Sequence, residues 1–139
     1  MSEQCGTGAI PRPDSAPVIA TLQALLLDGV PWRDGGKTPV GFDCYGLVHY
    51  AFSLGGIALP ETPEEARGAF EIIPPPYHAW DVLLARVAPY GERHIGLLLT
   101  PGWGYHCSRA SNGLARFVTA RGYWRQYLRH GLRYKPFLG

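Results

Sequence analysis

Cys44 is the residue of this chain best suited to nucleophilic chemistry. Apolar residues recur after it at helical spacing, at Leu47, Val48, Ala51 and Phe52. This pattern predicts an α-helix that begins at the cysteine, with Asp43 as a favourable N-cap. Backbone N–H groups in the first turn of a helix have no intrahelical partner, and together with the helix dipole they favour the thiolate. The alternative is that Cys44 packs under the helix as an inert apolar residue.

A cysteine nucleophile requires a base, and two of the five histidines are candidates. His94 and His106 lie in segments 94–100 and 104–108, both predicted to be strands. A turn at 101–103 would pair these strands and bring the two imidazoles side by side. The remaining histidines are expected to face away from the cysteine or to lie on the surface: His49, His78 and His130. A nucleophile, a base and a polar residue that orients the base are the parts of a cysteine hydrolase.

The same residues permit one other chemistry, a zinc site made by Cys44, His94, His106 and Cys107. Successive residues of a strand point to opposite faces, so His106 and Cys107 would not face the same ion. At most three ligands remain, and we therefore expect no metal and no other cofactor.

Three helices are predicted in the first half of the chain. The first runs from about residue 16 to 28, with Ser15 as its N-cap and Gly29 as its end. The second is the helix of Cys44, which ends at the glycine pair 55–56. A capping box at residues 62–65 opens the third, which is expected to continue to about residue 70. Residues 1–14 are predicted to form a flexible arm, and residues 15–139 a single domain.

From residue 71 onward the pattern indicates strands. Three prolines at 74–76 predict an extended spacer, and strands are expected at 80–87, 94–100, 104–108 and 114–119, with Asn112-Gly113 as a hairpin turn. Residues 123–134 are ambiguous, because arginines recur every four residues as on a helix while Gly131 and the aromatic residues allow a strand. Helices followed by antiparallel strands predict an α+β fold, with the cysteine helix packed on an antiparallel sheet.

Composition and charge narrow the possible classes of function. The 139 residues are 46% hydrophobic and 17% charged, as in an ordinary folded protein, and no run approaches the roughly 18 apolar residues of a membrane span. The N-terminus lacks the pattern of a secretory signal, and three cysteines fit synthesis in a reducing cytoplasm.

Charge is distributed unevenly along the chain. Residues 1–85 carry a net charge of −6, with ten acids against four bases, and residues 86–139 carry +8, with nine bases against Glu92. This asymmetry indicates either an anionic or acidic partner, or two halves that neutralise each other in the fold. No nucleic-acid-binding motif accompanies the basic half, so we expect no nucleic-acid partner.

Four segments together resemble the NlpC family of papain-like cell-wall peptidases. Residues 41–48, GFDCYGLV, resemble the family's GxDCxGLV signature, and HIGL at 94–97 resembles its H-[VI]-G-[IL] strand. YHCS at 105–108 resembles the following strand, whose polar residue is commonly histidine, and WDVL at 80–83 lies where the family usually has GD-[LV]. The resemblance extends from about residue 30 to about residue 119 and implies the papain-like NlpC fold.

The resemblance implies an acyl-transfer mechanism on the stem peptide of peptidoglycan. The thiolate of Cys44 would attack a peptide carbonyl, His94 would protonate the leaving amine, and His106 would orient His94. In this family the bond that is cut is typically next to D-glutamate and often joins it to a diamino acid. Oxyanion or substrate-binding roles are expected for five further residues: Asp43, Tyr45, Trp32, Arg93 and Arg109. Trp32 stands near the position of a tyrosine in many members, and Ala79-Trp80 replaces the usual Pro-Gly.

Two features are similar to the phage-tail and gene-transfer-agent branch of the family. Tyr45 follows the cysteine where wall enzymes usually have serine, and GIALP follows the helix at 56–60. This similarity implies synthesis in the host cytoplasm without a signal peptide, assembly into a tail with other tip or hub proteins, and wall penetration during DNA entry. The alternative is a structural tail-tip assembly protein with the same fold and little or no peptidase activity.

Overall fold

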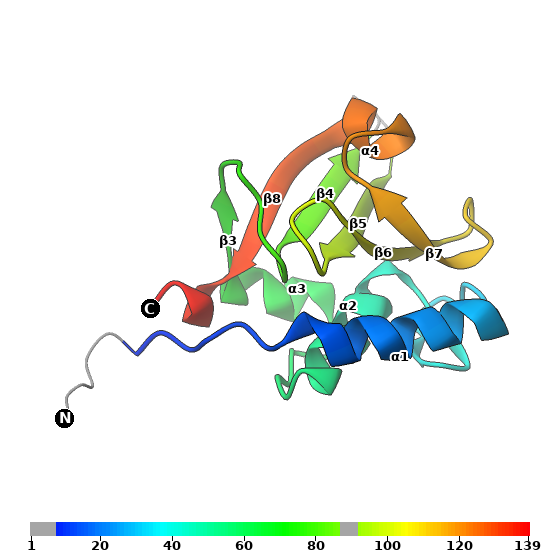
Figure 1. Ribbon diagram of the computed structural model, residues 1–139, viewed down its shortest axis with the longest axis horizontal. Helices are drawn as coiled ribbons and strands as arrows, with labels where there is room; N and C mark the ends of the chain where they lie inside the picture. Colours follow the sequence, from blue (N-terminus) through cyan, green and yellow to red (C-terminus); the bar gives the residue numbers. More distant parts are fainter. Residues whose placement is uncertain (1–7, 87–91) are drawn as a thin grey trace.

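The protein is an antiparallel β-sheet with three helices on one face and one short helix on the other (Figure 1). The structure is a computed structural model that describes residues 8–86 and 92–139. Helices α1 (Ser15–Asp28), α2 (Cys44–Leu54) and α3 (Pro63–Ala66) lie on the first face, and α4 (Gly122–Tyr127) on the second. The predicted α+β arrangement is confirmed.

Six strands form the main sheet in the spatial order β3-β8-β4-β5-β6-β7. Their bounds are β3 (Phe70–Ile73), β4 (Val82–Arg86), β5 (Arg93–Leu98), β6 (Trp103–Ser108), β7 (Gly113–Val118) and β8 (Leu128–Tyr134). Two further strands, β1 (Lys37–Thr38) and β2 (Gly41–Phe42), form a small hairpin before α2, and 3₁₀ turns occupy Arg67–Ala69 and Lys135–Phe137. All four predicted strands are present, with ends that differ by one or two residues where the structure describes them; residue 87 lies outside the described residues.

The helix signals of the sequence identify the helix starts closely. The Asp43 side chain accepts a hydrogen bond from Gly46 N, and Thr62 caps α3 through Glu65 N, both as predicted. The cap of α1 is Asp14, which accepts from Ala16 N, rather than Ser15. The third helix, predicted to continue to about residue 70, is α-helical to Ala66 and continues as the 3₁₀ turn Arg67–Ala69, after which Phe70 pairs with β8.

The ambiguous segment 123–134 contains both of its candidate structures. Residues up to Tyr127 form α4, and the chain then enters β8, which lies between β3 and β4. The four-residue repeat of arginines is therefore not one helix face: two of the arginines lie in or at the start of α4 and two in β8. Neither β3 nor its pairing with β8 was predicted, because the partners are separated by about sixty residues of sequence and the pairing leaves no local signal.

Each face of the sheet has its own apolar core. Helix α2 packs Leu47 and Phe52 against the first face, where Trp80 and Tyr105 are also fully buried. On the second face α4 packs Trp124 against Leu83, Leu98 and Phe117. The consecutive residues Leu97 and Leu98 of β5 therefore lie in different cores, as the pleat of a strand requires.

The segment before α1 contacts the domain. Within the predicted flexible arm, 1–14, residues 1–7 lie outside the described residues. Ile10 N donates to Pro136 O at 2.9 Å, and the Trp80 indole N–H donates to Pro13 O at 2.8 Å. The bond to Pro136 holds the two ends of the described chain near each other (Figure 1). In the described residues, no helix is long and apolar enough to cross a membrane.

Candidate active site

Cys44 is the first residue of α2, and its position depends on a close contact between that helix and the preceding loop. The Asp43 carboxylate accepts from Gly46 N at 2.6 Å and from Gly35 N at 3.0 Å, so it caps the helix and holds the loop at once. Gly46 lies against the carbonyl of Gly36, where any Cβ would overlap the backbone. The glycine two residues after the cysteine is therefore a requirement of this packing.

The two predicted histidines lie on neighbouring strands and are hydrogen-bonded to each other. His94 Nε2 and His106 Nδ1 are 2.8 Å apart, which confirms the predicted proximity. The pairing of β5 with β6 covers Leu97–Tyr105 and Leu98–Gly104 and does not extend to the histidines. Because Nε2 of His94 is used in this bond, Nδ1 is the ring nitrogen left to exchange a proton with a thiol or a substrate.

One cavity of about 940 Å³ connects these groups. Its walls include all three predicted catalytic residues, Cys44, His94 and His106, together with the five residues predicted for oxyanion or substrate binding: Asp43, Tyr45, Trp32, Arg93 and Arg109. The fold thus brings together residues that span almost eighty positions of the sequence. Within the described residues the thiol makes no hydrogen bond to either imidazole, so direct proton transfer between Cys44 and His94 requires the two side chains to move closer.

Burial dominates the electrostatics of the thiol. It raises the pKa of Cys44 above its ordinary value, and the neighbouring Asp43 carboxylate raises it further. The backbone N–H groups of Ile95, Tyr45 and Cys44 itself lower the pKa, as expected at a helix start, but they do not outweigh burial. The helix start favours the thiolate, as predicted, but burial has the larger effect and keeps the pKa of Cys44 above its ordinary value.

Burial also keeps the histidine pair neutral. It lowers the pKa of His94 to about 4 and that of His106 to about 4, the latter also through the charge of His94. Trp124 contributes to this burial, since its ring centroid lies 5.6 Å from that of His94 and 5.8 Å from that of His106. At neutral pH the site contains a thiol and uncharged imidazoles.

The five other predicted residues have distinct roles in the cavity wall. Trp32 lies in a loop that pairs with β2, and the guanidinium of Arg109 stacks 4.3 Å above its ring. Tyr45 turns its hydroxyl away from the cavity to donate to Pro60 O. Asp43 has both oxygens committed to backbone N–H groups, which indicates a structural role. Arg93 is exposed and has no ion-pair partner among the described residues.

Sequence reasoning missed the contribution of α4. Tyr123 and Trp124 line the cavity and pack on the histidines, although they come from the segment whose structure was ambiguous. The adjacent aromatic pair at these two positions was the available signal. Cys107 faces the first core and donates to Phe42 O, whereas His106 packs on the second-face residues Phe117 and Trp124, as strand alternation predicted. Across the described residues, no group of three or more His, Cys, Asp or Glu side chains is arranged to hold a metal ion.

Comparison with known proteins connects this geometry to a family. The model of the NlpC/P60 family matches residues 29–133, three quarters of the chain. The bifunctional muramidase/DL-endopeptidase CwlT of Bacillus subtilis is 33% identical over 110 residues, which cover 76% of this chain and 33% of that protein. The chain therefore spans about a third of the length of this relative.

Solved structures show the same fold. An NlpC/P60 family protein from Bacillus cereus superposes with a TM-score of 0.68 at 23% identity, over 89% of this chain and 41% of that one. The peptidoglycan hydrolase RipB from Mycobacterium tuberculosis gives 0.61 at 21% identity, over 96% of this chain and 72% of that one. With the family match over residues 29–133, the chain belongs to the NlpC/P60 family.

Proposed function

We propose that the protein is a cysteine peptidase that hydrolyses stem-peptide bonds of peptidoglycan. The observation that carries the proposal is the 2.8 Å bond between His94 Nε2 and His106 Nδ1 in a cavity that Cys44 also lines. Relatives named as DL-endopeptidases and peptidoglycan endopeptidases support the choice of substrate.

The proposed reaction begins from the neutral pair. As a substrate carbonyl approaches, His94 Nδ1 takes the proton of the Cys44 thiol, and the sulfur forms a bond to the carbonyl carbon. The backbone N–H of Cys44 stabilises the oxyanion. His94 then gives its proton to the departing amine as the C–N bond breaks, and later takes one from the water that hydrolyses the thioester. His106 keeps the His94 ring in place, because its Nδ1 accepts from the Nε2–H of His94 while His94 Nδ1 acts as the base.

Digestion of purified sacculi tests the proposal. Replacing Cys44 by alanine is expected to lower peptide release by at least about a thousandfold, because no other group supplies the nucleophile. Cys107→Ala is the matched control, since this thiol is buried in the core and has no proposed catalytic role. Circular dichroism of both variants reports folding. Undiminished digestion by Cys44→Ala would exclude the proposed nucleophile.

We further propose that the peptidase belongs to a phage-type tail and acts during DNA entry. The support is the sequence: Tyr45 beside the nucleophile and GIALP at 56–60. In the structure Tyr45 packs with 7% of its surface exposed and bonds to Pro60 O, so these two features form one contact. The test is mass spectrometry of purified particles made by the source genome; detection of the chain with tail-tip or hub proteins is expected, and its absence from particles contradicts the assignment.

The second candidate, a structural tail-tip protein with little activity, is favoured by Trp32 and Tyr45, which depart from the usual residues of wall enzymes, whereas the basic C-terminal half fits docking to a larger complex in either case. Part of that charge is used within the fold, since Arg133 pairs with buried Asp81 and Arg129 Nε donates to Arg86 O. Particles carrying Cys44→Ala distinguish the two functions. If they assemble normally but no longer digest sacculi, the enzyme is required; if digestion is equal in both particles, the structural function is favoured.

A further inference from the structure

Trp124 of helix α4 packs on both members of the histidine pair. Its ring centroid lies 5.6 Å from that of His94, at an interplanar angle of 44°, and 5.8 Å from that of His106, at 87°. Only 3% of Trp124 is exposed. One indole therefore covers two imidazoles that are hydrogen-bonded to each other, and it separates that bond from water on the α4 side.

The indole is held in place by Phe117 of β7 and by an open space over β5. The Trp124 and Phe117 rings stack with centroids 4.3 Å apart, and the Phe117 ring also meets that of His106 at 5.5 Å. At Gly96 a Cβ would lie 2.7 Å from Phe117 Cε1 and 2.9 Å from Trp124 Cζ2. Glycine at position 96 is therefore what allows the two aromatic rings to lie on the strand of His94.

The N–H of the Trp124 indole is buried and has no hydrogen-bond partner among the described residues. A buried donor without a partner destabilises the folded state, and in a native structure such a group calls for an explanation. Phenylalanine would fill part of the same space without an unpaired donor. The tryptophan is explained by the reach of its two fused rings, which lie on both imidazoles at once.

We propose that Trp124 is a positioning residue for the hydrolysis: its indole fixes the His94 ring in the orientation in which Nε2 donates to His106, and keeps water from that bond. His94 Nδ1 is then the nitrogen that exchanges a proton with Cys44. Without the indole, water competes for Nε2 and the His94 ring can rotate, so the base is correctly oriented for only part of the time. The effect of Trp124 is exerted through His94. The inference rests on the proposed peptidase function.

The charge of the pair depends on this cover, because the residues directly opposite on the neighbouring strands are uncharged. In the strand pairing, His94 lies opposite Ala85 of β4 and His106 opposite Ala115 of β7. Cys44 and Tyr123 add a thiol and a phenol to the cavity of the pair, and five charged side chains line it as well: Asp34, Asp43, Glu92, Arg93 and Arg109. Burial, without a contribution from these charges, lowers the pKa of His94 to about 4. Removal of the indole is therefore expected to raise that pKa toward its ordinary value of 6.5.

The first test compares three variants in the hydrolysis of soluble muropeptides prepared from sacculi. Trp124→Met keeps much of the buried volume without a rigid ring, Trp124→Phe keeps a smaller ring, and Tyr127→Met is the matched control. Tyr127 packs on the same core from the same helix and has no ring contact with either histidine among the described residues. The acid limb of kcat/KM reports the pKa of the base in the free enzyme.

Wild-type protein and Tyr127→Met are expected to share an acid limb well below pH 6.5, because their base is buried. In Trp124→Met the limb is expected to move up by about one pH unit or more. Its kcat at pH 7.5 is expected to be about tenfold lower with KM unchanged, since the loss concerns the orientation of the base and not substrate binding. Trp124→Phe is expected to lie between, with kcat within about threefold of wild type. A merely structural role would lower the folded fraction of both methionine variants, which circular dichroism reports, and would leave the acid limb unchanged.

The second test requires no turnover. Imidazole ¹H–¹⁵N spectra of the Cys44→Ala variant are expected to show His94 as a single neutral tautomer with its proton on Nε2 and to give a pKa of about 4. With Trp124→Met added, a mixture of tautomers and a higher pKa are expected; should this variant not fold, Trp124→Phe in the same background gives the comparison. An unchanged tautomer and pKa overturn the positioning role and leave the peptidase intact. The expected spectral changes, with no hydrolysis of muropeptides by wild-type protein, overturn the peptidase and support the positioning of the pair by Trp124.

Discussion

At the scale of single residues, Asp43 sets the environment of the neighbouring thiol. Its two carboxylate oxygens hold the N–H groups of Gly46 and Gly35, and its charge raises the pKa of Cys44. The same side chain is therefore required for the helix start and opposes thiolate formation. The pKa of Cys44 reflects this compromise together with burial.

Asp43→Asn separates the two effects. Asparagine is an equally good N-cap through its Oδ1, so α2 is expected to remain although the bond from Gly35 N is lost, while the loss of negative charge lowers the pKa of Cys44. The pH dependence of iodoacetamide alkylation, followed by mass spectrometry of the Cys44 peptide, measures that pKa. Wild-type alkylation is expected to rise at a pH above the ordinary range for cysteine, and the variant curve is expected to lie at lower pH. An unchanged curve would show that the Asp43 charge does not reach the thiol.

The histidine pair makes stability depend on pH. Burial lowers the pKa values of His94 and His106 to about 4, whereas both would be near 6.5 in the unfolded chain. Below pH 6.5 the unfolded state binds more protons, so stability is expected to fall as the pH drops toward about 4 and to be retained above about 6.5. The expected loss at pH 5 is on the order of 2 kcal/mol for each histidine.

Urea unfolding at pH 7.5 and pH 5 measures this loss. The double variant His94→Gln/His106→Gln is expected to show a smaller difference between the two pH values, because it removes the groups that take up protons. His130→Gln, at an exposed position of β8, is the control and is expected to behave as wild type. An equal difference in all three proteins would assign the pH dependence to other groups.

At the scale of elements, the turn before β4 depends on an unusual residue. Trp80 has a φ of 74°, in the left-handed region that glycine adopts readily and that costs other residues about 1–2 kcal/mol. The resemblance places a glycine at this position in related proteins. Trp80 is nevertheless fully buried with its ring against Phe52, and its indole N–H donates a hydrogen bond to Pro13 O. Packing of the indole therefore offsets the unfavourable backbone.

Trp80→Gly tests this balance. Glycine relieves the backbone cost, but loss of the buried indole costs about 3–5 kcal/mol, so a net destabilisation of about 2–3 kcal/mol is expected. The free energy of unfolding in urea gives the magnitude. Enhanced proteolysis near residues 10–13 is also expected, because the segment loses its bond to the indole. A variant as stable as wild type would mean that the site collapses around glycine without a cavity.

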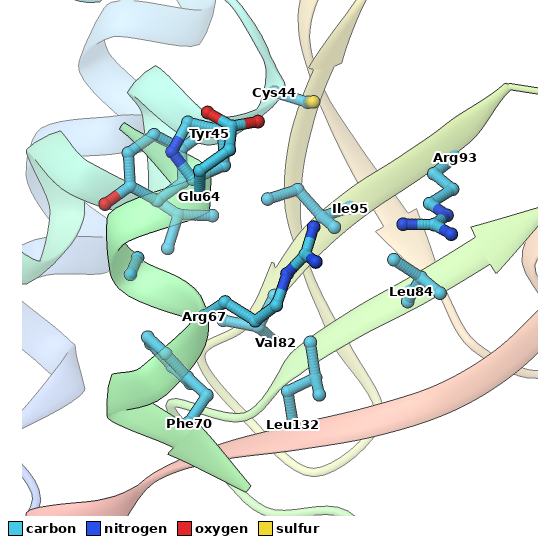
Figure 2. A pocket seen from close by; sticks show the side chains of 13 residues that line it. Cys44, Tyr45, Glu64, Arg67, Phe70, Val82, Leu84, Arg93, Ile95 and Leu132 are labelled. Atoms are coloured by element: carbon cyan, nitrogen blue, oxygen red, sulfur yellow. The ribbon is translucent and has the colours of Figure 1, made fainter. Parts of the chain in front are cut away.

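At the scale of the whole molecule, one buried ion pair joins the start of β4 to the neighbouring strand β8, which lies far from it in sequence. Arg133 of β8 donates to both carboxylate oxygens of Asp81, at 2.8 and 2.7 Å, and His78 N donates to the same carboxylate. The Asp81 side chain is fully buried. Since Leu132, the neighbour of Arg133, lines a cavity of about 350 Å³ that adjoins Cys44 (Figure 2), the pair also positions a wall of that cavity.

Arg133→Met is expected to destabilise the protein by about 3–5 kcal/mol, because it leaves a buried carboxylate without a partner. The double variant Asp81→Asn/Arg133→Met is expected to lose less than the sum of the single losses, since it removes the uncompensated charge as well. Urea unfolding of the four proteins completes the cycle. Additive losses would show that the two side chains contribute independently.

The sequence by itself determined the local features of this protein. Helical spacing after Cys44, the caps at Asp43 and Thr62, and the Asn112-Gly113 turn each depend on interactions over a few residues, and the structure contains all of them. Alternation along β6 likewise assigned His106 and Cys107 to different faces. The order of a nucleophile helix and two histidine strands was sufficient to predict which three residues share a cavity.

Only the tertiary structure decided the features that arise from contacts between distant segments. The pairing of β3 with β8, the Asp81–Arg133 ion pair and the packing of Trp124 on the histidines join residues far apart in sequence, where no periodicity is shared. The protonation state of Cys44 is likewise decided by the tertiary structure. Its first-turn position predicts a low pKa, but the pKa depends on how much water and which charges surround the sulfur, and the fold sets both.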